Sequence, residues 1–402
     1  MSAVAHHRPE PLGGPVVTPG MRPLVVLAAL GAAAMIYRFA VGLGGSTALN
    51  DGYPWGLWIA FDVVTGTALG CGGYAVALLV YILNKGEFHP AVRPALLTSA
   101  LGYSMAAVSI ILDVGRPWLL YRVPTYVTHW NTNSALFEVA LCVMAYVAVL
   151  WVEVSPAFLE RWRQGPAGLF KSLGDNLLPV LEKALPFVIA LGLLLPTMHQ
   201  SSLGTLMLLS GKKLHPLWST PLLPLLFLIS CLAMGYAVVV FESTLSSVAF
   251  KRPREGRMLA GLGKAVVPFL WAWAGIRLVD IVLRGKLGAL AFDGYSLLFL
   301  VEIALIVVPA VLLMSPARRA NPGDLFRAAI LMILAGTLYR IDTYLVAFRP
   351  GAQYAYFPSL VEIFATTGLV AIEILVYVWL VKRFPILTGA APAHAAAASQ
   401  VR

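Results

Sequence analysis

A predominantly apolar stretch from Trp55 to Leu83 has the sequence WGLWIAFDVVTGTALGCGGYAVALLVYIL. A helix needs about 20 apolar residues to cross the hydrocarbon core of a bilayer, so this stretch is long enough to span one. It also carries a carboxylate, Asp62, with no basic residue in the stretch to neutralise it. Because an unpaired charge is costly in lipid, Asp62 is expected to face a bundle interior or a wet cavity.

The composition extends this expectation to the whole chain, since 59% of its 402 residues are hydrophobic and only 12% are charged. Such a balance leaves too little polar surface for a soluble domain, so we expect an integral membrane protein. The formal charge of +10 comes from basic residues in short loops, and we expect no nucleic-acid partner. The cysteines, Cys71, Cys142 and Cys231, form no CxxC motif, and we interpret them as small packing residues rather than ligands of a metal or an iron–sulfur cluster.

The apolar runs predict an all-α polytopic membrane protein with about ten transmembrane helices. They lie at roughly 23–43, 55–84, 94–118, 131–156, 182–205, 219–245, 262–284, 295–315, 324–348 and 357–384. Residues 1–22 are expected to be an N-terminal tail, 23–385 the transmembrane helical domain, and 386–402 a disordered C-terminal tail.

The distribution of Lys and Arg predicts the orientation of the chain. Roughly 19 of these residues fall on the side of the two termini, and roughly 7 on the other. By the positive-inside rule, both termini are cytoplasmic in a bacterial inner membrane. The loops 44–54, 119–130, 206–218, 285–294 and 349–356 then face outward.

Many ionisable residues lie within the predicted spans, most of them toward the outer side, which is typical of a polar site or a wet path. The outer set is Asp62, Asp113, Glu138, His199, Arg277, Asp280, Glu302, Arg340, Asp342 and Glu362, whereas Glu242 lies near the cytoplasmic end and Glu373 near mid-membrane.

Two of the outer acids have basic residues three positions away on the same predicted helix. These spacings favour local ion pairs between Asp113 and Arg116 and between Arg277 and Asp280. Arg340 and Asp342 are two apart and do not face each other. A functional role is the interpretation for the residues without a local partner, which are Asp62, Glu138, His199, Glu242 and Glu302.

His199 lies in the stretch LLLPTMHQSS, where Pro196 is expected to kink the helix just before it. A membrane b-type haem commonly needs two histidines at matched depth, and His199 is the one histidine well inside a span, so we expect no haem. A quinone fits better, because buried carboxylates and a histidine can relay the protons that its reduction takes up. Tyr103, midway along its span, could donate to a quinone carbonyl or simply pack.

Several motifs resemble a known family. They are PWGLWIAFD, GCGGYA, ILDVGRPW, NSALFE, LLPTMHQSSLGTLM, KLHPLW, RIDTYLVAF and YAYFPS, and they are similar to HybB-type membrane subunits of uptake [NiFe]-hydrogenases, within the NrfD/polysulphide-reductase membrane-subunit family. The resemblance implies two four-helix bundles, at about 55–205 and 219–348, with the first and last helices additional.

The resemblance also implies a quinone site, with menaquinone the expected quinone, at the periplasmic end of the first bundle. Asp62, Tyr103 and His199 are the expected head-group contacts, and Asp113 and Arg116 complete the predicted quinone-binding set. The predicted proton relays are Glu138, Glu242, Glu302 and Glu373, with Glu242 and Glu373 on a route from the cytoplasm. Membrane lipid surrounds the chain, and the expected protein partners are a periplasmic ferredoxin-like iron–sulfur subunit and the hydrogenase small and large subunits.

Other functions stay open at this point. The chain could be an NrfD-type quinone-reacting subunit of a molybdenum reductase or another respiratory complex. Paired bundles with buried charges also suit a secondary transporter. A passive anchor leaves the unpaired acids unexplained. The sequence does not decide whether quinone reduction is coupled to charge translocation.

Overall fold

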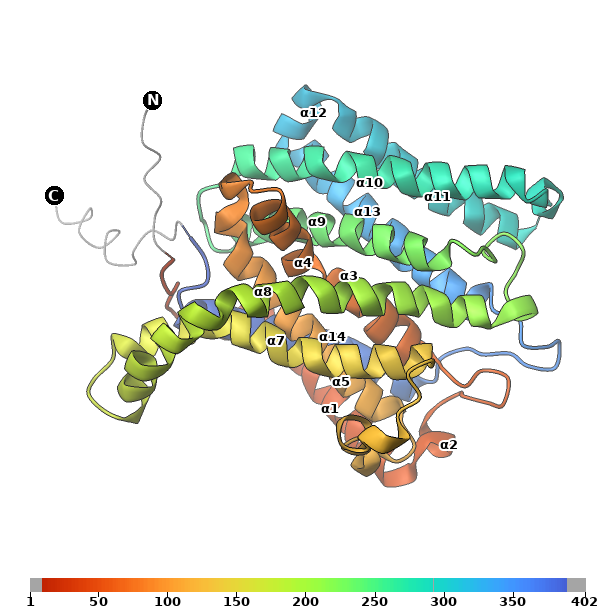
Figure 1. The fold of residues 1–402 in the computed structure, drawn as a ribbon. Helices are drawn as coiled ribbons and strands as arrows, with labels where there is room; N and C mark the ends of the chain where they lie inside the picture. The colour runs from red at the N-terminus through yellow and green to blue at the C-terminus, as the bar shows by residue number, and fades with distance from the viewer. Residues whose placement is uncertain (1–8, 292, 389–402) are drawn as a thin grey trace.

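The computed structural model describes residues 9–291 and 293–388 (Figure 1). Within these ranges every named element is helical, and the one extended pairing is an isolated antiparallel bridge between Leu214 and Phe348. Ten helices are long and apolar enough to cross a membrane, which confirms the predicted all-α polytopic fold with ten spans. They are Pro19–Val41, Trp58–Ile82, Gly86–Asp113, Ala135–Arg163, Leu169–Leu209, Leu223–Ala249, Gly256–Leu283, Gly294–Met314, Pro322–Val346 and Leu360–Arg383.

Most spans consist mainly of one α-helix. These are α1 (Arg22–Val41), α5 (Val92–Asp113), α7 (Ala135–Arg163), α8 (Leu169–Leu209), α9 (Leu223–Ala249), α10 (Gly256–Leu283), α11 (Gly294–Met314), α13 (Pro322–Ile341) and α14 (Leu360–Arg383). The short helices α2 (Leu43–Ser46), α6 (Arg122–Thr125) and α12 (Pro316–Ala320) lie between them. α8 continues through Pro196 without interruption.

The second span is irregular. It begins with a π-helix at Trp58–Thr65, continues through α3 (Gly66–Leu69) and α4 (Gly72–Ala77), and ends with a second π-helix at Leu78–Ile82. The ninth span likewise ends in a π-helix, Asp342–Val346. π-Turns inside helices are rare and frequent at functional sites. Two of these three segments carry a buried aspartate, Asp62 and Asp342.

The helices pack in two sets of four. The second span, α5, α7 and α8 contact one another in sequence order, and α9, α10, α11 and α13 form the other set (Figure 1). α9 joins the two sets, since it also lies against α8 and the second span. α1 packs along α14, where a Cβ atom on Gly31 would lie 2.4 Å from Cα of Gly368. Small residues at such contacts let membrane helices approach closely.

Both ends of the described chain lie at one end of the molecule, which we call the terminal face. Glu10 N–H donates to the Leu387 carbonyl at 3.3 Å, and Leu12 N–H donates to the Val381 carbonyl at 3.1 Å. Ile386 and Leu387 are buried, so the packed domain continues past the predicted boundary at 385. The tails predicted within 1–8 and 389–402 fall outside the described residues.

At the opposite end, which we call the loop face, the connections between spans pack on one another. His215 N–H donates to the Ala347 carbonyl at 2.8 Å, beside the bridge from Leu214 to Phe348. Tyr53 Oη donates to the Phe348 carbonyl at 2.9 Å, and Trp55 Nε1 to the Tyr344 carbonyl at 3.0 Å. These bonds tie three connections into one surface.

Candidate functional site

Tyr103 of α5 and His199 of α8 form a hydrogen bond in the middle of the first set of helices. Tyr103 Oη lies 2.8 Å from His199 Nε2, and both side chains are fully buried. His199 Nδ1 lies 2.9 Å from the Leu195 carbonyl of its own helix. Because a carbonyl can only accept, Nδ1 carries a hydrogen, and Nε2 is the atom that can accept from Tyr103. The structure therefore brings together two predicted site residues.

Three further side chains complete what we call the Tyr103 group, which consists of Tyr103, His199, Gln200, Thr67 and Cys71. Gln200 Nε2 donates to Thr67 Oγ1 at 3.0 Å and lies 3.4 Å from Tyr103 Oη. Cys71 Sγ lies 3.5 Å from the same Oη. Gln200 Oε1 is buried without a partner in the described part of the chain, although buried polar atoms are normally hydrogen-bonded.

Arg340 of α13 is a buried cation beside this group. Its guanidinium donates to the Val64 carbonyl and the Phe227 carbonyl, both at 2.9 Å, and to Ser230 Oγ at 3.2 Å. It also lies 4.7 Å from the centre of the Phe227 ring. Among the described residues, no carboxylate pairs with it. Arg340 thus connects the second span to α9, and its charge is stabilised by carbonyl oxygens and an aromatic ring.

Asp62 lies on the other side of the second span, facing α14. Its Oδ2 accepts a hydrogen bond from Thr366 Oγ1 at 2.8 Å. Within the described residues, three buried polar atoms of this region have no partner, and they are Trp58 Nε1, Ser109 Oγ and Asp113 Oδ1. We call Asp62, Thr366, Trp58, Ser109 and Asp113 the Asp62 group. Unpaired donors and acceptors in one place suit a polar ligand or water.

The predicted ion pair between Asp113 and Arg116 is wrong. α5 ends at Asp113, and Val114 is extended, so the three-residue spacing no longer places the two side chains on one helical face. Arg116 is exposed. Arg38 of α1 lies at this helix end instead, and it donates to the Leu112 carbonyl at 2.6 Å and to the Val114 carbonyl at 2.8 Å.

The predicted pair between Arg277 and Asp280 is also wrong. Arg277 reaches inward and pairs with Glu302 of α11 at 3.5 Å, with both side chains buried. Glu302 Oε1 also accepts from Trp218 Nε1 at 2.8 Å. Asp280 instead lies 3.9 Å from Arg284, one turn further on. Glu302, for which the sequence shows no local partner, is thus held in a structural pair with a residue of another helix in the second set.

A line of polar residues follows one face of α14. Glu362, Thr366, Glu373 and Tyr377 are four, seven and four residues apart, which keeps them on one side of the helix. Glu362 is structural, because it accepts from Tyr356 Oη at 2.6 Å and from Ala48 N–H at 2.9 Å and completes a capping box. A Cβ on Gly102 would lie 3.5 Å from Glu373 Oε1, so Glu373 lies against α5.

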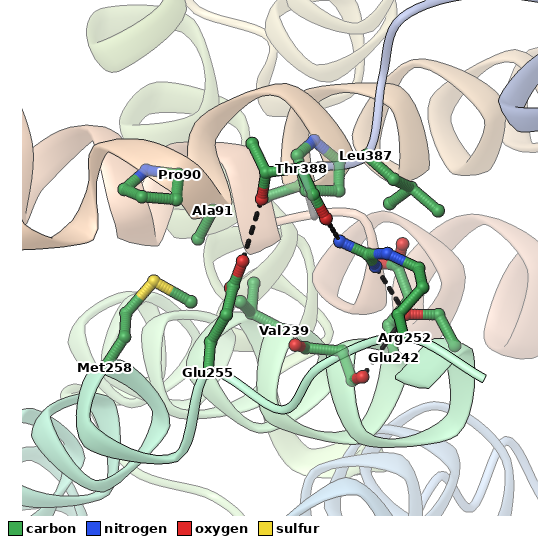
Figure 2. A pocket seen from close by; sticks show the side chains of 13 residues that line it. Pro90, Ala91, Val239, Glu242, Arg252, Glu255, Met258, Leu387 and Thr388 are labelled. Carbon is green, nitrogen blue, oxygen red and sulfur yellow. Dashed lines mark hydrogen bonds between the residues drawn. The ribbon is translucent and has the colours of Figure 1, made fainter. Parts of the chain in front are cut away.

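Glu242 of α9 lies at the terminal end of this line, where it accepts hydrogen bonds from Thr98 and Tyr377. Figure 2 shows Glu242 lining a recess with Arg252, Glu255 and Thr388. Arg252 donates to the Thr388 carbonyl, and Thr388 Oγ1 donates to Glu255 Oε1 at 2.8 Å. Burial lowers the pKa of Arg252, while the nearby Glu255 carboxylate raises it.

α7 carries the acids Glu138 and Glu153 within its membrane-spanning part. Glu138, a predicted relay, lies half-buried in the first turn of α7, and its carboxyl makes no hydrogen bond in the described part of the chain. Glu153 was missed, although it lies well inside the same span. The signal was present in the sequence as an acid within WVEVSP, inside the predicted span of 131–156.

The described residues contain no cluster of three or more His, Cys, Asp or Glu side chains that could hold a metal ion. They also do not fit a haem held by two histidines. Both ring nitrogens of His199 are engaged within the Tyr103 group and its helix, while His89 and His129 are exposed in connections. His215 stacks on Tyr295 at the loop face.

Comparisons with known proteins match this chain along nearly its whole length. Residues 45–345 match the family described as "Polysulphide reductase, NrfD". The "Probable Ni/Fe-hydrogenase 2 b-type cytochrome subunit" of Escherichia coli K12 is 41% identical over 392 residues, covering 95% of each chain. The "Menaquinone reductase, integral membrane subunit" of Nitratidesulfovibrio vulgaris is 29% identical, covering 85% of each chain. A selenate reductase subunit of Mesobacillus selenatarsenatis is 24% identical, covering 92% of this chain and 95% of that one.

Proposed function

This chain belongs to the NrfD family of membrane subunits, and on that premise we propose that it passes electrons to a membrane quinone as part of a periplasm-facing [NiFe]-hydrogenase complex. The similarity to a hydrogenase-2 subunit supports the complex, and the similarity to a menaquinone reductase subunit supports menaquinone as the electron acceptor. A periplasmic ferredoxin-like iron–sulfur subunit, docked on the loop face, supplies the electrons from the hydrogenase small and large subunits.

The observation that carries the proposal is the Tyr103 group. A quinone head group needs hydrogen-bond donors at its two carbonyl oxygens, and a proton for each oxygen once two electrons arrive. The hydroxyl of Tyr103 and the amide of Gln200 are donors in the group, and His199 Nε2 can take up and return a proton. Full burial keeps these donors away from bulk water, where their hydrogen bonds would be weaker.

Three acids on or beside α14, namely Asp62, Glu373 and Glu242, form the proposed proton route. Asp62, Glu373 and Glu242 follow α14 from the loop face to the terminal face, and Glu242 opens into a recess there. We assign the terminal face to the cytoplasm, because most basic residues lie on that side. In this assignment Glu242 takes up cytoplasmic protons, Glu373 passes them on, and Asp62 delivers them toward the quinone. Uptake from the cytoplasm would couple quinone reduction to charge movement.

Asp113 stays in the proposed site as an acid without a hydrogen-bond partner in the described residues, and Arg116 is proposed only as an exposed contact after the end of α5. Glu138, in the first turn of α7, is proposed to relay protons at the loop face. Glu302 is better explained by its pair with Arg277.

The second candidate is a quinone-reacting subunit of another reductase. The 24% identity to a selenate reductase subunit keeps this candidate open, but the 41% identity to a hydrogenase-2 subunit favours the hydrogenase. A secondary transporter has no support from the comparisons.

The test is hydrogen-dependent reduction of a menaquinone analogue by the complex purified through this chain. His199→Ala and Asp62→Asn are each expected to lower the rate at least about tenfold, since a positioned acid or base contributes about 10²–10⁴. Hydrogen-dependent reduction of a viologen dye should stay unchanged. Cys142→Ala, a buried change in α7 outside both groups, is the matched control.

Two results would contradict the proposal in different ways. If both variants reduce the analogue at the wild-type rate, the assigned site is wrong. If the wild-type complex does not reduce it with hydrogen at all, the proposed function is wrong.

A further inference from the structure

A second recess opens at the terminal face, separate from the one that Glu242 lines. It lies among the second span, α5, α7 and α8, and it holds about 980 Å³ of space free of protein atoms, part of it open to solvent. Tyr81, Arg93, Glu153 and Glu182 are polar residues of its wall. The proposed function uses none of them.

Glu153 is the inner acid of this recess. Its carboxyl lies against Gly192 of α8, where an added Cβ would be 2.8 Å and 3.1 Å from its two oxygens. Within the described residues this carboxyl has no hydrogen-bond partner and no ion pair. The Gly192 carbonyl also lacks its helical donor, because the residue four positions on is Pro196, which has no N–H. An unpaired acid that lines the recess thus lies against a residue whose carbonyl has no helical donor.

The other charged residues of the recess are either paired or exposed. Glu160 forms an ion pair with Arg93 at 2.6 Å. Glu182 and His89 are exposed at the mouth. Among the described acids that line this recess, Glu153 is therefore the one that is partly buried and forms no ion pair.

Three helices lead from the recess to the Tyr103 group, and each carries a hydroxyl on the way. On α7, Tyr146 lies seven residues before Glu153, two turns deeper in the helix set. It is fully buried, and the centre of its ring lies 4.6 Å from that of Tyr103. On α8, Thr197 follows Gly192 and precedes His199 by two residues. On the second span, Tyr74 lies two turns inward of Tyr81, and its Oη lies 2.7 Å from Thr197 Oγ1.

We propose that this recess is a second cytoplasmic proton-uptake site, in which Glu153 passes protons by way of Tyr74 and Thr197 and then Tyr146, whose ring lies against that of Tyr103, toward Tyr103 and His199. The inference rests on the proposed function. Protonated Glu153 gives its proton to water that bridges to these hydroxyls, since Thr197 is five residues beyond Gly192, a rise of about 7.5 Å along α8. Water in the recess then reprotonates the carboxylate. The two protons that a quinone takes up thus have two intake acids, Glu242 leading to Asp62 and Glu153 leading to His199.

The experiment uses the whole complex in liposomes, with the cytoplasmic side outward, hydrogen as donor and a menaquinone analogue as acceptor. Glu153→Gln is expected to lower quinone reduction and external proton uptake together, by about tenfold or more. Viologen reduction should not change, Glu153→Asp should recover a large part of both rates, and Glu87→Gln, at an exposed acid outside both recesses, should match the wild type. A Glu153→Gln complex with wild-type rates of both processes overturns the inference but leaves the proposed function intact.

Dicyclohexylcarbodiimide, which reacts with protonated carboxyl groups in apolar surroundings, keeps the inference testable if Glu153→Gln fails to assemble. Applied to the wild-type complex, it is expected to modify Glu153 in parallel with the loss of quinone reduction. Complete modification of Glu153 without such a loss would contradict the inference. A wild-type complex that never reduces the quinone analogue would instead overturn the proposed function.

Discussion

Arg277 and Glu302 form a fully buried ion pair whose partners depend on each other. Arg277 also lies over the rings of Trp273, Phe299 and Tyr339, at 4.9–5.5 Å from their centres. Removal of one partner from such a pair leaves an uncompensated buried charge, which costs about 3–5 kcal/mol. Replacing both partners with apolar residues of similar volume avoids that cost.

Arg277→Met is therefore expected to lower the free energy of unfolding by about 3–5 kcal/mol, and the double variant with Glu302→Met should recover most of the loss. Denaturant unfolding of the purified protein in detergent measures both. A double variant no more stable than Arg277→Met would show that the pair is not the source of the loss.

For individual residues, burial was easier to predict from the sequence than the hydrogen-bond or ion-pair partner. Tyr103 and His199 were both predicted to contact the same ligand, and they prove to be hydrogen-bonded to each other. Their shared neighbour Cys71 was interpreted as packing alone, because a single cysteine carries no spacing signal. Arg277 and Glu302 are 25 residues apart, and no local rule pairs residues on different helices.

At the scale of helices, the contact of α1 with α14 depends on two glycines. A Cβ on Gly31 would lie 2.4 Å from Cα of Gly368 and 2.9 Å from the Phe364 carbonyl, so backbone atoms would have to move. Gly31→Ala is expected to lower stability by about 1–3 kcal/mol, the usual cost of overpacking.

Gly275→Ala on α10 is the matched control, because no atom lies within 4 Å of the added Cβ, and alanine favours a helix. The measurement is thermal unfolding of the two variants side by side at one scan rate. Equal melting temperatures for the variants would contradict the close contact of α1 and α14.

The loop face contains a histidine whose burial makes stability depend on pH. His215 stacks on Tyr295 with ring centres 4.4 Å apart. Burial lowers its pKa from the ordinary value of 6.5, Arg349 and Lys286 lower it further, and Asp293 opposes them. The unfolded chain therefore binds a proton more readily than the folded chain, so this contribution is complete above pH 6.5 and is lost as the pH falls below it.

The melting temperature should thus fall between pH 7.5 and pH 5, and His215→Gln should make that fall smaller. Thermal unfolding across this range checks both statements. If the variant and the wild type lose stability in parallel, His215 does not cause the dependence.

The number and type of the membrane-spanning helices were predicted from the sequence, but the π-helical segments within two of them were not. Runs of about 20 apolar residues locate the spans. The π-helices around Asp62 and Asp342 have no such signal, because their composition is as apolar as that of their neighbours. The ends of α5 and α7 were also misplaced. The predicted runs ended at 118 and 156, whereas α5 ends at Asp113 and α7 continues past Pro156 to Arg163.

For the whole molecule, the two sets of four helices place the Tyr103 group in the first set and the Arg277–Glu302 pair in the second. α9 and Arg340 join the sets. One terminal-face recess is lined by Glu242, which accepts a hydrogen bond from Tyr377 of α14, and the other is lined by Glu153, which lies against Gly192 of α8. In the proposed proton routes, these two acids, far apart in sequence, would serve one reaction.

The most direct test of the hydrogenase assignment is the metal content of the complex that co-purifies with this chain from its native membrane. Nickel, iron and molybdenum are measured by elemental analysis in the same preparation. For a [NiFe]-hydrogenase with an iron–sulfur subunit, we expect nickel together with a several-fold excess of iron. Molybdenum without nickel, or none of the three metals in an intact complex, would contradict it.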